Sequence, residues 1–234
     1  MRLASAIRYD LRLQFRHGFY YAYLIVCIVY IGVIRSLPVG IRQQALAVTL
    51  LTDPSILGFL FLGGIILLEK GQKTLEGIFI TPIRMGEYIW SKVISLTVLA
   101  LLSSFLITVA SVGFTFNVIW LFLGIGLTSV LFVFMGFTLV SFTKTVNGYL
   151  LSSPIYFVVA TMPLLDYFKL QESPLFYIIP TQSTLTLIDA AFGPKPVGEL
   201  ILSVILLLGF NYLAYLWASK WFYKYIVLRT GAAA

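Results

Sequence analysis

The sequence is dominated by six long apolar runs separated by polar segments. Runs of roughly 18 or more apolar residues match the thickness of a lipid bilayer and are uncommon in soluble domains. The composition agrees, because 60% of the 234 residues are hydrophobic and 11% are charged, less than half the charged share of a typical soluble protein. We therefore predict an all-α membrane protein with six transmembrane helices. The predicted spans cover residues 19–34, 49–68, 93–112, 118–141, 149–165 and 200–218.

The basic residues predict the orientation of these spans. Lys and Arg are enriched in the cytoplasmic loops of membrane proteins, and placing both termini in the cytoplasm puts twelve of the sixteen basic residues on that side. The four on the outer side are Arg35, Arg42, Lys169 and Lys195. We predict a multi-pass protein of the inner or plasma membrane with both termini in the cytoplasm. The net charge of +7 is then explained by topology, and no nucleic-acid partner is expected.

Residues 1–18 predict an amphipathic helix that lies in the membrane interface. Apolar and basic residues each recur every four positions, which places them on two neighbouring stripes of one helix. The apolar stripe is formed by Leu3, Ile7, Leu11 and Phe15, and the basic stripe by Arg8, Arg12 and Arg16. The basic stripe suits either anionic lipid head groups or an acidic protein partner, and the spacing leaves both open.

A polar segment of 24 residues, 69–92, separates the second and third spans. It reads EKGQKTLEGIFITPIRMGEYIWSK and carries charges of both signs. Thr74 can cap a short helix, Glu76 suits the positively polarised N-terminal end of that helix, and Pro82 stops it. We predict a short cytosolic helix whose charged surface meets another protein. The alternative is an ordinary solvated loop.

Four prolines interrupt the semi-apolar stretch between the fifth and sixth spans, residues 166–199. Pro180 can begin a short helix with Thr181 or Ser183 as its cap, and Gly193 suits the position after its last residue. We predict short or re-entrant helices on the outer side, buried against the protein. A surface loop with an amphipathic turn is the alternative.

The fifth span has one mildly polar face. Its polar residues recur at positions i, i+3, i+4 and i+7 of a helix, and so lie on one side. These residues are Tyr149, Ser152, Ser153 and Tyr156. Such a face can line a transport path, but small hydroxyl residues serve helix packing in membranes equally well. Both interpretations stay open.

The sequence offers little material for catalysis, metal binding or ATP binding. His17 is the only histidine and Cys27 the only cysteine, too few for a metal site or an internal disulfide. The stretch 71–74, GQKT, lacks the preceding glycines of a phosphate-binding loop. Apart from Asp53, the predicted span interiors hold no ionisable residue, whereas proton-coupled carriers use such residues as relays. We expect no catalytic residue, metal or cofactor in this chain.

The polar segment 69–92 resembles the corresponding cytosolic stretch of ABC-2-type exporter permeases. The resemblance is carried by Glu69, Thr74, Leu75, Glu76, Thr81, Pro82, Glu87 and Lys92. The order of an amphipathic N-terminal helix, six spans and a proline-started helix at 180–193 also resembles that family, and in particular its drug-exporting subgroup, which includes fluoroquinolone exporters. Many members have a second acid and a glycine where this chain has Gly71 and Lys73.

The resemblance implies a permease domain at residues 19–230, followed by a tail at residues 231–234. The permease domain would move a hydrophobic or amphipathic substrate out of the cell by alternating access. It implies a second permease copy, identical or paralogous, and separate ATPase subunits that bind ATP and Mg. The eight residues above would form the coupling contact with the ATPase. A gradient-driven secondary carrier and an intramembrane lipid-modifying enzyme are alternative functions. The sequence shows neither the inverted repeats of many carriers nor a cluster of polar catalytic residues.

Overall fold

The structure is a computed structural model and describes residues 2–80, 83–171 and 173–228. Within these ranges six helices are long and apolar enough to cross a membrane, which confirms the predicted all-α membrane fold. The six are α2 (Phe19–Ser36), α3 (Val39–Gly71), α5 (Met85–Val112), α6 (Val118–Phe142), α7 continued by α8 (Val146–Thr161 and Pro163–Tyr167), and α10 continued by the π-helical turn η2 (Val197–Phe222 and Tyr223–Val227). The shorter helices are α1 (Arg2–Arg16), α4 (Thr74–Ile80), the 3-10 helix η1 (Pro174–Ile178) and α9 (Pro180–Phe192).

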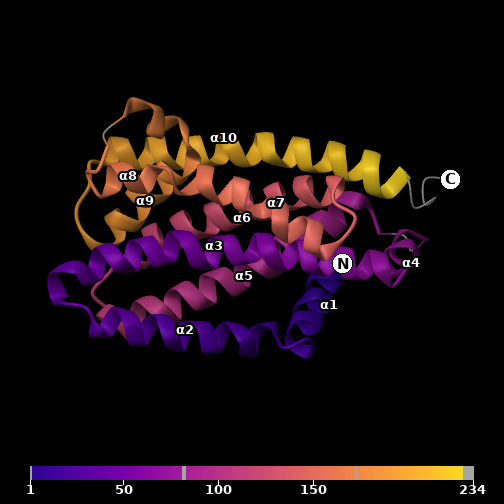
Figure 1. Cartoon of the computed structure of the whole chain (residues 1–234), viewed down its shortest axis with the longest axis horizontal. Coiled ribbons are helices and arrows are strands. Elements are labelled where there is room, and N and C mark those ends of the chain that lie inside the picture. The colour runs from indigo at the N-terminus through magenta and orange to yellow at the C-terminus, as the bar shows by residue number, and fades with distance from the viewer. Residues whose placement is uncertain (1, 81–82, 172, 229–234) are drawn as a thin grey trace.

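The long helices lie roughly side by side along the long axis of the molecule, which is horizontal in Figure 1, and the short helices gather at the two ends of the bundle. We call the end that holds α1, α4 and the last turns of α10 the α4 end. The opposite end, with α8, α9 and the turn between α2 and α3, is the α9 end. The basic residues predicted on the outer side belong to segments at the α9 end, and the other described Lys and Arg residues belong to segments at the α4 end.

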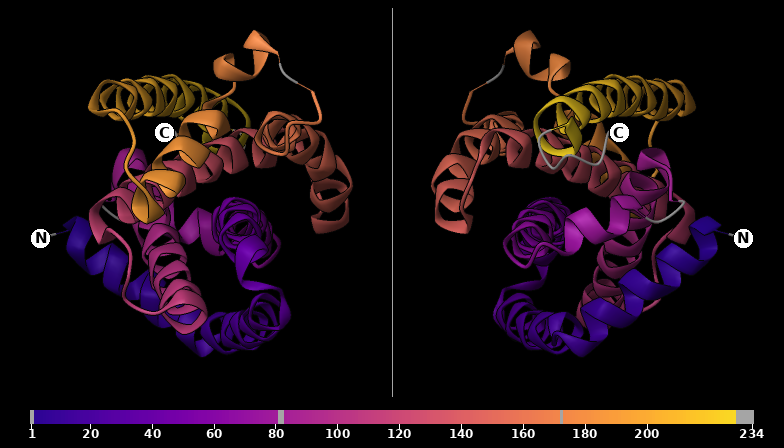
Figure 2. Two further views of the ribbon diagram at one scale, coloured as in Figure 1. Left: turned by 90° about the vertical axis from the view of Figure 1, so that its left-hand side faces the viewer. Right: turned by 90° about the vertical axis from the view of Figure 1, so that its right-hand side faces the viewer.

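The helix α6 lies at the centre of the bundle (Figure 2). It carries no charged residue and is apolar on all sides, a pattern typical of a buried helix. It packs against α3, α5, α9 and α10. Small residues allow this close approach, since a Cβ placed on Gly124 would come 3.1 Å from the Leu187 Cβ of α9. The peripheral helices α2 and α7 instead expose apolar side chains such as Ile25 and Leu151, as expected of lipid-facing surface.

The helix α3 is longer than the sequence predicted. It begins at Val39 instead of residue 49, and its 33 residues span about 50 Å at 1.5 Å per residue. The loop predicted between residues 34 and 49 is reduced to Leu37 and Pro38. The Arg42 guanidinium donates to the carbonyls of Leu37 and Arg35 at 2.9 and 2.7 Å. The basic residue that interrupts the apolar run therefore closes the turn and does not lie in an extended loop.

The buried short helix predicted between the fifth and sixth spans is present as α9. It starts at Pro180 and its C-cap is Gly193, as expected. The predicted caps were wrong, because the residue before Pro180 occupies the N-cap position and the Thr181 hydroxyl donates instead to a carbonyl of α7 at 2.7 Å. Against α6, the hydroxyls of Thr184 and Thr128 lie 2.6 Å apart. Neighbouring helices thus provide hydrogen-bond partners for two hydroxyls of α9, as expected of a short helix placed among spans.

Candidate functional site

The α4 end is built around the short connection between α3 and α5. Gln72 and Lys73 join α3 to α4, and Lys73 adopts a left-handed backbone conformation with φ of 56°. The Thr74 hydroxyl donates to the Glu69 carbonyl at 3.0 Å and ties the first residue of α4 to the last turns of α3. Because α4 has seven residues, its own hydrogen bonds stabilise it little, and tertiary packing must hold it.

Leu75 supplies that packing. Its side chain is completely buried and belongs to the core cluster that contains Tyr88 of α5 and Phe222 of α10. Burying a leucine side chain contributes roughly 1.5–3 kcal/mol. The sequence predicted that Leu75 contacts an ATPase directly, but its side chain is buried inside the protein and is not available to a partner at the surface. Leu75 anchors α4 to the bundle and can act on a partner only through the position of α4.

Three charged side chains from three helices meet inside the α4 end. The Lys92 Nζ of α5 lies 2.6 Å from Asp10 Oδ1 of α1 and 2.7 Å from Glu69 Oε1 of α3. The second oxygen of each carboxylate also has a donor, because the Tyr88 hydroxyl donates to Glu69 Oε2 at 2.6 Å and the Ser91 hydroxyl to Asp10 Oδ2 at 2.7 Å. We call Asp10, Glu69 and Lys92 the charge triad. Each of the three residues is at most 7% exposed.

The charge triad fixes α1, α3 and α5 to one another. Buried charges are tolerated where they are paired and their remaining hydrogen-bonding groups are satisfied, and here every carboxylate oxygen has a partner. One turn away, Gln14 Nε2 donates to the Ser95 hydroxyl at 2.8 Å, a second polar contact between α1 and α5. The helix α1, which lies across the axis of the long helices (Figure 1), is thereby tied to the bundle by specific polar bonds.

Sequence reasoning missed Asp10 and misplaced Glu69 and Lys92. It put the latter two in an exposed cytosolic segment that contacts the ATPase, whereas both are buried in membrane helices. The reason is that α5 begins at Met85, eight residues before the predicted start of the third span, so Lys92 lies in its second turn. A signal was available for Asp10, which follows Ile7 by three residues and so adjoins the apolar stripe of α1, where a carboxylate requires a partner.

The remaining residues predicted at the coupling contact have other surroundings. The Glu87 carboxylate accepts from the Arg84 backbone amide at 2.8 Å and caps α5. Thr81, Pro82 and the side chain of Glu76 lie outside the described residues. The basic stripe of α1 is exposed and lies on the side opposite to Asp10, because two residues turn an α-helix by about 200°. It comprises Arg8, Arg12 and Arg16.

A cavity of about 890 Å³ lies beside the charge triad, between α1, α3, α4 and α5. Its volume falls in the range of small-molecule sites, roughly 300–1,000 Å³. Apolar side chains such as Leu13, Ile65 and Ile78 line much of it, and the charge triad forms part of its polar wall. Within the part of the chain that the structure describes, no group of three His, Cys, Asp or Glu residues is placed to hold a metal ion.

The polar face predicted on the fifth span is used for packing at its first member. Tyr149 is completely buried, and its hydroxyl donates to the Phe59 carbonyl of α3 at 2.7 Å. Its ring fills the space left by two glycines, since a Cβ on Gly63 would overlap the ring and one on Gly136 would come 3.0 Å from the hydroxyl. The Ser153 hydroxyl donates to its own helix. Tyr149 is therefore no pathway residue in this structure. Partial exposure remains for Ser152 and Tyr156.

The profile of the fluoroquinolones export permease protein family matches residues 1–230 of this sequence. The chain belongs to this family. Two relatives, each named a fluoroquinolones export permease protein, come from Mycobacterium tuberculosis strains CDC 1551 / Oshkosh and ATCC 25618 / H37Rv. Each is 32% identical to this chain over 239 residues, which covers 98% of this chain and 98% of the relative.

Membership of this family makes the chain a permease subunit of an export system, a transport protein and not an enzyme. It confirms the resemblance found in the sequence, including the drug-exporting subgroup. Together with the six apolar helices, it establishes a multi-pass membrane protein.

Proposed function

We propose that this chain is the membrane subunit of an ABC exporter. In this proposal the α4 end faces the cytoplasm, separate ATPase subunits bind ATP and Mg, and a second permease copy, identical or paralogous, completes the transport path. The substrate is an amphipathic molecule of the fluoroquinolone kind, as the names of the relatives suggest. Transport proceeds by alternating access between the two sides of the membrane.

The observation that carries this proposal is that α4 is packed firmly against the ends of the membrane helices. ATP binding at a cytosolic partner can change the spans only through an element that moves with them and contacts the partner differently in two states. Leu75 seats α4 in the core, and the charge triad ties the adjoining ends of α3 and α5 to α1. A push on the exposed side of α4, at Gly77 or at the preceding linker residue Lys73, would therefore be transmitted to three helices at once.

The charge distribution supports the proposed orientation. Basic residues concentrate on cytoplasmic segments of membrane proteins, and the segments at the α4 end carry most of the Lys and Arg residues of this chain. The exposed basic stripe of α1 lies at the same end. The α4 end is therefore the cytoplasmic end in this proposal, and the exposed arginines lie level with the lipid head groups and the ATPase.

A gradient-driven carrier is less well supported. A proton relay needs ionisable groups that open to both sides of the membrane. The charge triad instead lies at one end of the helices, and every carboxylate oxygen in it is occupied by a donor. This geometry is that of a structural contact between helices and not that of a proton relay.

Reconstitution tests the proposal. The chain is purified alone and together with the ABC ATPase encoded nearest to its gene, and both preparations are placed in liposomes with radiolabelled fluoroquinolone outside. We expect ATP-dependent uptake into vesicles whose ATPase faces outward, and none with the chain alone or with an ATPase variant that cannot hydrolyse ATP. Uptake by the chain alone that follows an imposed proton gradient would establish the carrier and reject the ABC exporter.

A further inference from the structure

A second, basic cavity lies at the α4 end, where the last turns of α3, α6 and α10 meet. Its volume is about 340 Å³, enough for a small polar head group. Two of its lining residues are lysines, and none of the described lining residues is acidic. The lining consists of Lys70, Ser141, Phe142, Thr143, Lys144 and Tyr225.

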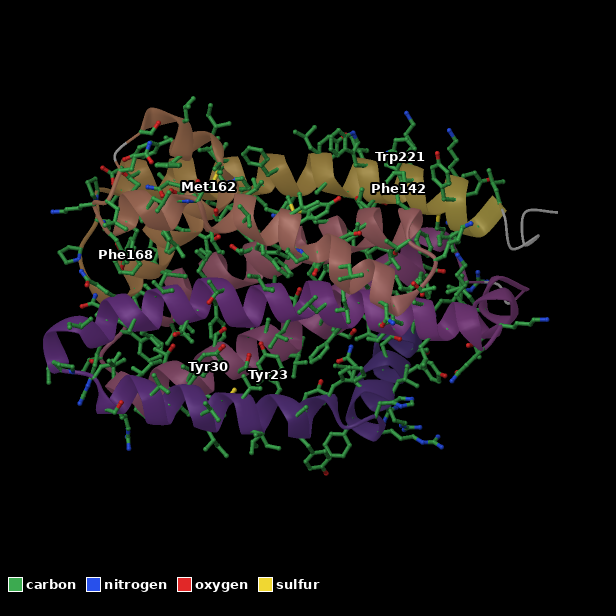
Figure 3. All side chains as sticks on the ribbon, viewed as in Figure 1. Tyr23, Tyr30, Phe142, Met162, Phe168 and Trp221 are labelled. Atoms are coloured by element: carbon green, nitrogen blue, oxygen red, sulfur yellow. The ribbon has the colours of Figure 1, made fainter. Side chains whose placement is uncertain are left out.

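Two aromatic residues, Phe142 and Tyr225, line this cavity, and a third ring, that of Trp221, packs against both. Phe142 lies 5.1 Å from Trp221 and 5.3 Å from Tyr225, and the rings of Trp221 and Tyr225 stack at 5.4 Å. Figure 3 shows Phe142 and Trp221 next to each other where α6 and α10 approach the α4 end. The Lys224 ammonium lies 5.5 Å from the centres of both the Trp221 and the Tyr225 rings. Tryptophan and tyrosine concentrate at the level of lipid head groups, which places this cavity at the membrane surface.

The backbone at this point departs from the regular α-helix. Residues Tyr223–Val227 form the π-helical turn η2 at the C-terminal end of α10. The wider turn buries Ile226 and Val227 in the core while leaving Tyr223 and Lys224 exposed. Tyr225, in the middle of this turn, is the member of η2 that lines the cavity.

We propose that this cavity binds the phosphate group of an anionic glycerophospholipid. Basic cavities between helices at the cytoplasmic surface attract such lipids because the ammonium groups complement the phosphate. Two of the three hydroxyl-bearing residues in the lining, Ser141 and Thr143, donate to carbonyls of their own helix at 2.8 and 3.3 Å. In this proposal the ammonium groups of Lys70 and Lys144 in the lining attract the phosphate, and Lys224, which lies over the Tyr225 ring, adds a third positive charge nearby.

The surroundings also accommodate the acyl chains of such a lipid. Trp217 and Leu213 precede Trp221 by one and two turns of α10, and both are well exposed. Residues at four-residue spacing form one stripe of a helix, so this apolar stripe leads from the cavity toward the middle of the membrane. The proposal concerns lipid binding alone and stands independently of the substrate and the energy source.

Fluorescence quenching by brominated lipids tests the site. Trp221 is made the only tryptophan by Trp90→Phe, Trp120→Phe and Trp217→Phe, and the full chain is placed in phosphatidylcholine nanodiscs. A fixed fraction of brominated phosphatidylglycerol should quench Trp221 more than the same fraction of brominated phosphatidylcholine. Each lysine removed should lower this preference about fivefold, since a basic residue near an anionic lipid surface contributes about 1 kcal/mol.

Matched variants separate this site from a general effect of charge. Lys70→Gln/Lys144→Gln removes two charges at the cavity, and Lys169→Gln/Lys195→Gln removes two at the α9 end. Only the first pair should lower the preference for phosphatidylglycerol, by about 25-fold for the two lysines together. Equal quenching by both lipids in the parent protein, or equal loss in both pairs, would overturn the proposal, as would full competition by inorganic phosphate. If the double variant does not give the helical spectrum and single elution peak of the parent, Lys144→Gln alone replaces it, because Lys144 is exposed.

Discussion

Replacing Lys92 by methionine should destabilise the fold more than any other single change in the charge triad. The substitution keeps most of the side-chain volume and removes the only cation of the cluster. Asp10 and Glu69 each lose the partner that lies 2.6 or 2.7 Å away, yet both carboxylates remain buried. The free energy of unfolding therefore falls for two reasons. The attraction between Lys92 and each carboxylate is lost, and two anions stay buried without a cation beside them.

The expected magnitude follows from the burial of the triad. Removing one partner of a buried ion pair costs about 3–5 kcal/mol. Lys92 serves two such pairs, so we expect Lys92→Met to lower the free energy of unfolding by about 5 kcal/mol, the upper end of that range. Asp10→Asn should cost less, because the pair of Lys92 with Glu69 survives it.

An apolar version of the cluster serves as the decisive comparison. Asp10→Leu, Glu69→Met, Tyr88→Phe and Lys92→Met together remove all charges, and the one hydroxyl left, that of Ser91, also donates to the Tyr88 carbonyl at 2.9 Å. Apolar replacement of a whole buried ion cluster is often neutral or stabilising. This variant should therefore be more stable than Lys92→Met, by at least about 2 kcal/mol.

Unfolding by sodium dodecyl sulfate in mixed micelles, followed by circular dichroism, measures these differences. Lys220→Met is the surface control, since Lys220 is exposed at the same end of the bundle, and it should change stability by less than about 0.5 kcal/mol. If Lys92→Met unfolds like Lys220→Met, the triad is not a buried joint. If the apolar variant is as unstable as Lys92→Met, packing and not charge pairing holds α1 in place.

Three further predictions follow from the packing, the orientation and the surface charge. Gly63→Ala should destabilise the protein by about 1–3 kcal/mol, because the added methyl group would overlap with the Tyr149 ring. The neighbouring Gly64→Ala should not destabilise it, because its methyl group would meet nothing within 4 Å. Equal effects of the two substitutions in the same unfolding assay would contradict this packing. In a Cys27→Ser background, thiols at the α9 end should react with an impermeant reagent added outside cells and a thiol at the α4 end should not, and the reverse labelling would invert the proposed orientation. The positions are Gln43 and Gln171 for the α9 end and Gln72 for the α4 end, all exposed. Replacing the three arginines of the basic stripe of α1 by glutamine should change the free energy of unfolding by less than about 0.5 kcal/mol, because surface substitutions rarely have a larger effect. The same variant should bind anionic vesicles more weakly. A large loss of stability would show that these arginines are structural.

The six spans and the short helix α9 could be predicted because their signals are local. A long apolar run is sufficient to indicate a membrane helix, and Pro180 and Gly193 mark the ends of α9 through their own backbone preferences. The ends of the spans were less predictable. A hydropathy pattern stops at the first charged residue, whereas α3 and α5 continue as helices past Arg42 and Lys92 because those side chains find partners inside the protein.

The charge triad could not be derived from the sequence because its members are distant along the chain. Lys92 lies 23 residues from Glu69 and 82 residues from Asp10, and the pairing depends on how α1 packs against α5. The same limit applies to Tyr149, whose polar hydroxyl suggested a transport path. Its role is set by a carbonyl on α3, 90 residues away, and by glycines on α3 and α6, so no local pattern on its own helix distinguishes packing from lining.

The charge triad also determines the order in which the protein assembles during synthesis. Asp10 leaves the ribosome early, but its cation is 82 residues further along the chain, which takes about 4–16 s at the usual 5–20 residues per second. Until Lys92 is in the membrane, docking α1 would bury an unpaired carboxylate at a cost of several kcal/mol. The first helix to be made must therefore wait at the membrane surface, held by its arginines, while the next two helices insert. It docks against α3 and α5 only after α5 has arrived.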